Sequence, residues 1–102
     1  MAYRVVFSPK AEAQLLELYR NIAARASPAI AESYVAAIIE YCRSLSMFPE
    51  RGVRMDDIRP SLRTVGYRRR VTLAFEVTND LVSILGVYYG GQDFEADLES
   101  DD

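Results

Sequence analysis

Two Ser-Pro pairs, nineteen residues apart, constrain the first half of this chain more than any other feature. Ser8-Pro9 and Ser27-Pro28 each place a hydroxyl at a helix N-cap and a proline at the first helical position. They predict one helix from residue 9 to about Arg25 and a second from residue 28 to about Met47, which ends near Pro49. Because the connection is short, the helices should form an antiparallel hairpin. Their core faces, read from helical spacing, are Ala11, Leu15, Leu18 and Ile22, then Ile30, Tyr34, Ile38, Tyr41 and Leu45.

Strands are expected on both sides of the hairpin in the sequence. One runs from Tyr3 to Phe7, and two more, separated by Gly66, cover residues 62–65 and 69–77. Between the hairpin and these strands, residues 50–59 are irregular, with a turn at Gly52. After a tight turn at 78–80, Leu81–Tyr89 is apolar on both faces apart from Ser83, so we place it inside the sheet. The order β-α-α-β-β-β predicts an α+β fold, with the helical hairpin on one face of a mainly antiparallel sheet.

Charge divides the chain into two parts. Six acidic residues and no basic residue occupy the last ten positions, whereas the first 92 residues carry twelve bases and nine acids. We expect a single domain over residues 1–94 and an acidic, disordered tail over residues 95–102. No stretch is long and apolar enough for a membrane span or a signal peptide. A lone Cys42, expected to be buried, and the absence of histidine argue against disulfides and metal sites, and favour a cytoplasmic protein without a cofactor.

The segment from Arg51 to Arg70 is strongly basic. It contains seven arginines and two aspartates, a local charge of +5. Arginine makes planar, bidentate contacts with carboxylates and phosphates. We interpret the segment as a surface for an anionic partner, and a solvated rim is the alternative. The residues expected to bind the target are Arg51, Arg54, Arg63, Arg68, Arg69 and Arg70.

Both helices of the hairpin carry a second apolar stripe beyond their core faces. A helix with so wide an apolar arc is difficult to bury within a small domain. We interpret the stripes as a groove for a partner's helix, and a thick core or a homodimer contact is the alternative. The residues expected to bind this partner are Leu16, Tyr19, Ala23, Ala31, Val35 and Ile39.

Four short sequence motifs resemble those of the ParE branch of the RelE/ParE superfamily of bacterial toxins. They are Phe7-Ser8-Pro9-Lys10-Ala11, Phe48-Pro49-Glu50-Arg51-Gly52, Leu62-Arg63 followed by Gly66-Tyr67-Arg68, and Ile84-Leu85-Gly86-Val87-Tyr88-Tyr89-Gly90. The resemblance covers roughly residues 3–94. It implies that the first strand lies beside the last, and that the partner is a ParD-like antitoxin of a plasmid-stabilization type of system. For the ParE branch it implies DNA gyrase as the target, and for the RelE branch mRNA on the ribosome.

One position departs from the family pattern. Many relatives resemble Val-x-His-Gly at the end of the last strand, and Tyr89 stands where that histidine would be. A phenol is a poorer base near neutral pH than an imidazole. A ribonuclease would otherwise use Glu50 or Glu76 as base, Tyr88 or Tyr89 as acid, and Arg63 and Arg69 as phosphate clamps. Lys10, in the first helical turn, is expected to lie far from these residues.

Three functional hypotheses remain. The first is a non-enzymatic poison that binds DNA gyrase and is neutralised by its antitoxin, with no membrane association and no direct sequence-specific DNA binding by this chain alone. The second is a metal-independent, ribosome-dependent mRNA endonuclease of the RelE type. The third is a non-toxic homologue that only binds an antitoxin.

Overall fold

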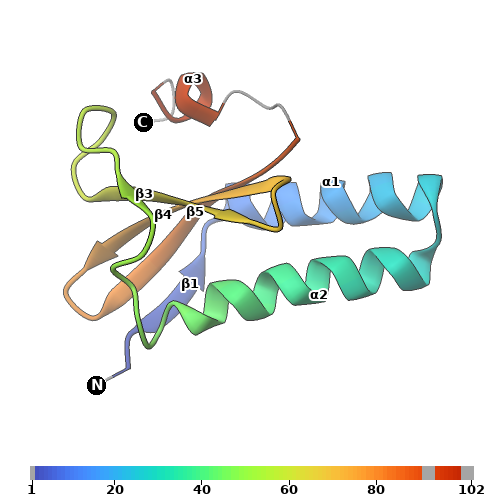
Figure 1. Cartoon of the computed structure of the whole chain (residues 1–102), viewed down its shortest axis with the longest axis horizontal. Coiled ribbons are helices and arrows are strands. Elements are labelled where there is room, and N and C mark those ends of the chain that lie inside the picture. Colours follow the sequence, from blue (N-terminus) through green and yellow to red (C-terminus); the bar gives the residue numbers. More distant parts are fainter. Residues whose placement is uncertain (1, 91–93, 100–102) are drawn as a thin grey trace.

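The computed structural model describes residues 2–90 and 94–99 as one layered α+β unit. The elements are β1 (Arg4–Phe7), α1 (Pro9–Arg25), α2 (Pro28–Ser44), β2 (Val53–Arg54), β3 (Leu62–Tyr67), β4 (Val71–Thr78), β5 (Leu81–Tyr89) and α3 (Phe94–Glu99). Figure 1 shows the sheet between the α1–α2 hairpin on one side and α3 on the other. The expected α+β class and strand–hairpin–strand order are confirmed.

The two Ser-Pro pairs begin the helices as predicted. Ser8 Oγ accepts a hydrogen bond from the Ala11 N–H at 3.0 Å, and Ser27 Oγ accepts one from the Ile30 N–H at 3.1 Å. Each bond satisfies a backbone donor that the first helical turn leaves without a partner. Helix α2 ends at Ser44, earlier than expected, and the next residues form tighter turns in which each N–H bonds three residues back.

The sheet has the strand order β1-β5-β4-β3-β2. Strand β1 pairs in parallel with the first half of β5, from Leu81 to Ile84, so the first and last strands lie side by side as the resemblance implied. The other neighbours are antiparallel, with an irregularity between Ala74 and Phe75. The placement of Leu81–Tyr89 inside the sheet is therefore confirmed.

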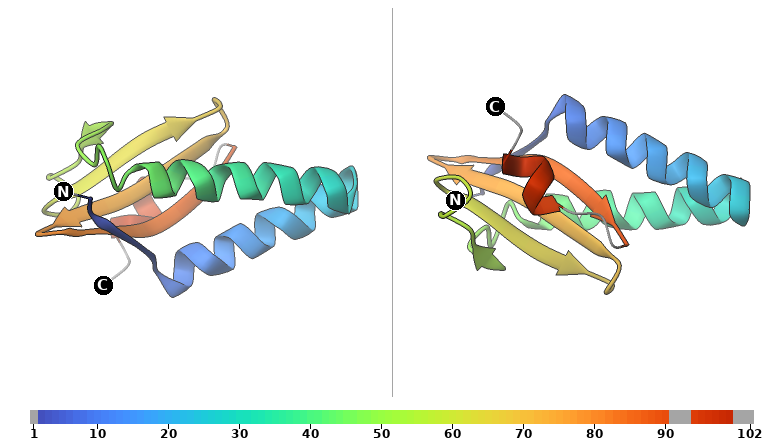
Figure 2. Two further views of the ribbon diagram at one scale, coloured as in Figure 1. Left: turned by 90° about the horizontal axis from the view of Figure 1, so that it is seen from below. Right: turned by 90° about the horizontal axis from the view of Figure 1, so that it is seen from above.

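Each face of the sheet has its own apolar cluster. The larger cluster joins the hairpin to residues such as Leu73, Phe75 and Ile84. The smaller one lies on the opposite face, where Leu98 of α3 meets Leu62, Ala74 and Tyr88. Figure 2 shows the hairpin crossing one face and α3 lying over the other. This second cluster explains why β5 must be apolar on both sides.

The region around Gly66 was predicted incorrectly. Strand β3 continues through Gly66 to Tyr67, and the chain reverses at Arg68–Arg70 instead. Arg68 and Arg69 take positive φ values of 51° and 67°. Strand β4 therefore starts at Val71, and Arg69 and Arg70 lie in a turn and not in a strand. Short strand β2 was also missed, within a stretch expected to be irregular.

The acidic tail also differs from expectation. Residues 94–99, taken mostly as the start of a disordered tail, form helix α3, and Leu98 is only 2% exposed. Phe94 and Leu98, four residues apart, share one helical face and pack against the sheet. The many acidic residues around them suggested disorder, although this apolar pair stabilises the helix. The remainder of the expected tail, residues 100–102, lies outside the described residues.

Candidate functional site

The basic segment is divided between two ends of the sheet. Arg51, Arg54 and Arg63 lie near the start of β3, and Arg68–Arg70 form the turn after its end. Arg63 and Tyr67, the residue before the turn, are four residues apart along the extended strand, which corresponds to about 13 Å. Figure 1 shows the β3–β4 turn beside the helices and the β2 region at the opposite end. The arginines therefore form two separate groups and not one continuous surface.

At the first end, arginine side chains support the loop that follows α2. The Arg51 guanidinium lies 5.7 Å from the Tyr41 ring centroid and 5.8 Å from that of Phe48, and it donates to Ser44 Oγ at 3.2 Å. Arg63 donates to the Arg51 backbone oxygen at 3.5 Å. The Phe48 side chain remains 65% exposed. Arg51 and Arg63 therefore have structural partners, while Phe48 adds exposed apolar surface beside them.

Two other arginines of the basic segment, Arg54 and Arg59, are paired with acids. Arg54 lies 2.9 Å from an Asp56 carboxylate oxygen, and Arg59 lies 3.5 Å from one of Glu76. Such exposed or half-exposed pairs contribute only about 0–1 kcal/mol each. They do, however, reduce the positive charge that this end of the sheet presents.

The second end combines arginines with tyrosines. We call Tyr34, Tyr67, Arg68, Arg69, Arg70 and Tyr89 the tyrosine–arginine end. Tyr34 and Tyr89 meet edge to face at 6.2 Å, and the Arg68 guanidinium lies 5.2 Å from the centre of the Tyr67 ring, which stacks on Tyr41 at 4.7 Å. Within residues 2–90 and 94–99, none of the three arginine side chains forms an ion pair.

The turn arginines act electrostatically on the Tyr34 phenol. Burial raises the pKa of Tyr34 above its ordinary value, and the nearby Tyr89 raises it further. The positive charges of Arg68 and Arg70 oppose this rise, because they favour the phenolate. The side chains of α2 and of the β3–β4 turn thus share one local environment.

The expected nuclease residues do not come together. Arg63 pairs with Phe75 in the sheet and so faces the hairpin, as Tyr89 does through its contact with Tyr34. Glu76 and Tyr88 belong to the opposite face, and Arg69 lies in the turn. Glu50 is exposed in the loop after α2. Arg63 and Tyr89 therefore share the hairpin side of the sheet, while the other candidate acid, base and clamp residues lie on the opposite face, in the β3–β4 turn or in the loop after α2.

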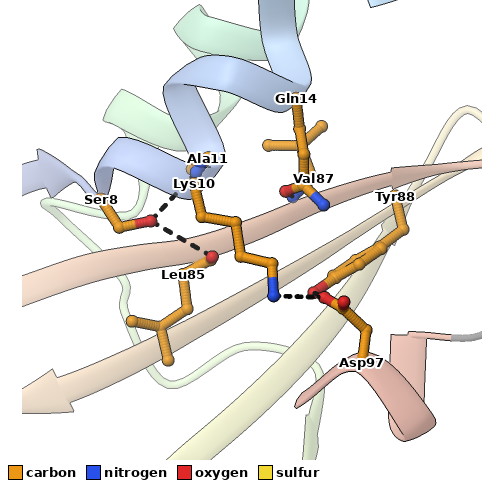
Figure 3. A network of polar contacts seen from close by, with 8 residues as sticks. All are labelled: Ser8, Lys10, Ala11, Gln14, Leu85, Val87, Tyr88 and Asp97. Atoms are coloured by element: carbon orange, nitrogen blue, oxygen red, sulfur yellow. Dashed lines mark hydrogen bonds and ion pairs between the residues drawn. The ribbon is translucent and has the colours of Figure 1, made fainter. Parts of the chain in front are cut away.

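Lys10 was expected to lie far from these residues, and for Tyr88 this was wrong. Its Nζ lies 2.6 Å from Asp97 Oδ2, and the Tyr88 hydroxyl donates to the same oxygen at 2.6 Å (Figure 3). These two hydrogen bonds, from Lys10 first and from Tyr88, hold the pKa of Asp97 below its usual value. The Tyr88 ring lies close over Gly86, where a β-carbon would come within 2.5 Å of it. The network joins α1, β5 and α3, and sequence reasoning missed it.

A groove of about 430 Å³ lies between α1 and the end of β5. Strand β1 pairs with β5 only as far as Ile84, so the second half of this edge of β5 faces α1. There Gln14 Oε1 accepts the Val87 N–H at 2.7 Å (Figure 3). The groove is lined by Gln14, Glu17, Leu18, Asn21, Ile22, Arg25, Ala26, Val87 and Tyr89. It is an apolar groove with a polar rim, and the apolar stripes of the sequence do not indicate it.

The surplus stripes themselves are only partly exposed. Ala31 is 0% exposed, and Val35 and Ile39 pack against the hairpin-side core, so the second stripe of α2 is mainly internal. Helix α2 has a wide apolar arc because it contacts both α1 and the core. Leu16 remains 50% exposed, and Tyr19 and Ala23 are half-buried. Ile30, expected in the core, is 56% exposed near the tip of the hairpin.

The described part of the chain can also be compared with what a metal site, a membrane span and a cysteine nucleophile require. Among residues 2–90 and 94–99, no group of three or more metal-binding side chains is assembled. No helix in these ranges has the length and apolar character that crossing a bilayer requires. Cys42 is buried, and burial raises the pKa of its thiol to about 12, so it is not a reactive nucleophile.

The chain is similar to proteins of known toxin–antitoxin systems, both in sequence and in fold. Residues 5–94 match the family described as ParE toxin of type II toxin-antitoxin system, parDE. A chain of the chromosomal ParDE system from P. aeruginosa has a TM-score of 0.76 and 22% identity, covering 87% of this chain and 97% of that one. A chain of the RelBE2 toxin–antitoxin complex from Mycobacterium tuberculosis has a TM-score of 0.61 and 21% identity, covering 87% and 99%. No curated protein matches the chain.

The Lys10–Asp97 contact predicts a pH-dependent stability. Asp97→Asn should lower the free energy of unfolding at pH 7 by less than about 1 kcal/mol, because the pair is partly exposed. A carboxyl whose folded-state pKa is depressed stabilises the fold above its unfolded pKa and loses that effect as it is protonated. The difference from the parent should therefore shrink as the pH falls below 3.8.

Urea titrations at pH 7, 4 and 3 measure this difference, with Glu95→Gln as a control for net charge on the same helix. An Asp97→Asn deficit of equal size at every pH would mean that the contact does not stabilise the fold.

Proposed function

We propose a function for this chain from one premise: it belongs to the ParE toxin family of type II toxin–antitoxin systems. The function is that of a cytoplasmic poison that acts by binding, with DNA gyrase as its target. A ParD-like antitoxin covers part of its surface and keeps it inactive. The antitoxin contact is proposed for the apolar surface along α1. The target contact is proposed for the arginines Arg51, Arg54, Arg63, Arg68, Arg69 and Arg70.

The observation that carries the binding mechanism is the separation of the residues that an endonuclease would need. Catalysis by positioned acids and bases requires them within hydrogen-bond reach of one reacting group. Here the Tyr88 hydroxyl is bonded to Asp97, Glu76 is paired with Arg59, and Tyr89 packs on Tyr34 across the sheet from both. By contrast, a binding poison needs only a stable, accessible contact surface, and the exposed arginine turn supplies one.

The antitoxin is proposed to occupy the α1–β5 groove. Leu18, Ile22, Val87 and Tyr89 give it an apolar floor, while Glu17 and Arg25 stand at its rim. An amphipathic segment would place its apolar side on this floor, which is the helix-in-groove mode of recognition. The two structural relatives were determined as parts of ParDE and RelBE systems, which supports an antitoxin as the partner.

The first functional prediction separates poison from nuclease. Arg69→Ala should reduce growth inhibition at least tenfold in colony counts, because it removes a charged contact from the target surface. Tyr89→Phe should leave inhibition unchanged, because the proposed role of this ring is packing. The parent should inhibit DNA supercoiling by purified gyrase and leave mRNA intact on programmed ribosomes. If the parent cleaves that mRNA and Tyr89→Phe does not, the binding-poison hypothesis is wrong and the chain is a RelE-type endonuclease.

The second functional prediction concerns the groove. Asn21 is exposed and lines it, so Asn21→Tyr should fill it and weaken antitoxin binding at least tenfold without disturbing the core. Arg20→Tyr, an exposed neighbour that does not line the groove, is the matched control. Affinity is measured by calorimetric titration and folding by thermal melting. If Leu16→Asp weakens binding while Asn21→Tyr does not, the antitoxin covers the outer side of α1 instead.

A further inference from the structure

The β3–β4 turn has an unusual composition for its geometry. Arg68 and Arg69 have φ values of 51° and 67°, a left-handed region that glycine or asparagine occupies more readily. Two adjacent arginines in this region are strained by their side chains and repel each other by charge. Backbone strain of this kind concentrates at binding and catalytic sites, where the side chain is needed for function.

The backbone of this turn is held in place on both sides. The Arg70 N–H donates to the Arg68 carbonyl at 2.7 Å, and the Gly90 N–H donates to the Arg70 carbonyl at 2.8 Å. Tyr67 and Val71 close the turn as a pair of the β3–β4 ladder. The three exposed guanidinium groups therefore extend from a fixed base, so less conformational freedom is lost when they bind.

Tyrosines surround the base of the turn. Tyr34 and Tyr67 are half-buried, as is Tyr89, and each comes from a different element of the fold. Arginine and tyrosine are enriched among the residues that dominate protein–protein binding energy. The tyrosine–arginine end thus has both the composition and the rigidity of a binding hot spot.

We propose that the tyrosine–arginine end is the target-binding surface of the chain, and that it binds a carboxylate-rich segment of a protein. Guanidinium forks bind carboxylates with two parallel hydrogen bonds, and the hydroxyls of Tyr34 and Tyr67 add further donors beside them. Among the described residues no acid pairs with Arg68, Arg69 or Arg70, so the charge of this end is balanced only when a partner arrives.

A protein segment fits this surface better than a nucleic acid does. Single-stranded nucleic acids bind along a continuous basic track with open aromatic faces for the bases. Here the Tyr67 ring already contacts Tyr41 and Arg68, and Tyr34 already contacts Tyr89. The next arginine back along β3, Arg63, lies about 13 Å along the strand from Tyr67 and bonds to a backbone oxygen. The cations are therefore confined to one turn.

The inference rests on the proposed function only in the identity of the target, so the first test does not use gyrase. A labelled decamer of glutamate serves as the carboxylate probe, and a thymidine decanucleotide of similar charge as the nucleic-acid probe. The parent protein should bind polyglutamate more tightly than the oligonucleotide in fluorescence anisotropy. Arg69→Gly should weaken polyglutamate binding at least fivefold, whereas Arg20→Ala, which removes one exposed positive charge elsewhere, should not.

The glycine variant also separates loss of function from loss of fold. Glycine accepts the positive φ of residue 69, so the thermal midpoint of Arg69→Gly should equal or exceed that of the parent. The same variant should bind gyrase at least tenfold more weakly in a pull-down titration. If the parent binds polyglutamate through Arg69 but does not bind gyrase, the proposed target is wrong and the surface stands. Equal losses in Arg69→Gly and Arg20→Ala, or tighter binding of the oligonucleotide, would overturn the inference.

Discussion

Strand β5 is the element on which the rest of this structure depends, because it is hydrogen-bonded or packed on every side. It pairs in parallel with β1 and antiparallel with β4. Ser8 and Gln14 of the α1 region bond to its backbone beyond the point where β1 ends. Its side chains serve both apolar clusters. The groove, the Tyr34–Tyr89 contact and the attachment of α3 through Tyr88 all follow from its position.

Much of the fold could be predicted because its signals are local. A serine and a proline mark each helix start, and the doubly apolar run of β5 indicates an interior strand. The arginine turn could not be predicted in this way, since Gly66 is the better local signal for a chain reversal. Its place is set by the ladder that pairs Tyr67 with Val71. Local propensity disfavours arginine at the positive φ values of Arg68 and Arg69, so it does not indicate a turn at these positions.

The candidate site was harder to predict because it depends on long-range contacts. Lys10 and Asp97 meet across almost the whole sequence, and neither residue alone indicates the other. The basic segment is a single stretch of the sequence, but strand β3 runs through it and places its arginines at two ends of the sheet. The second apolar stripe of α2 was interpreted as a partner surface. It is buried instead because the hairpin packs over the sheet, and this packing cannot be predicted from the helix sequence alone. The Phe94–Leu98 spacing was the one available signal for α3, and the high acidic content concealed it.

Two partners are proposed for two neighbouring surfaces that share Tyr89: the antitoxin for the α1–β5 groove and the target for the tyrosine–arginine end. Amide hydrogen exchange, followed by mass spectrometry for the chain alone and in each complex, tests this most directly. The antitoxin should slow exchange in residues 14–26 and leave the turn at 67–71 unchanged. Gyrase should slow exchange in the turn. Protection of the same single segment by both partners, or no protection of the turn by gyrase, would contradict the account.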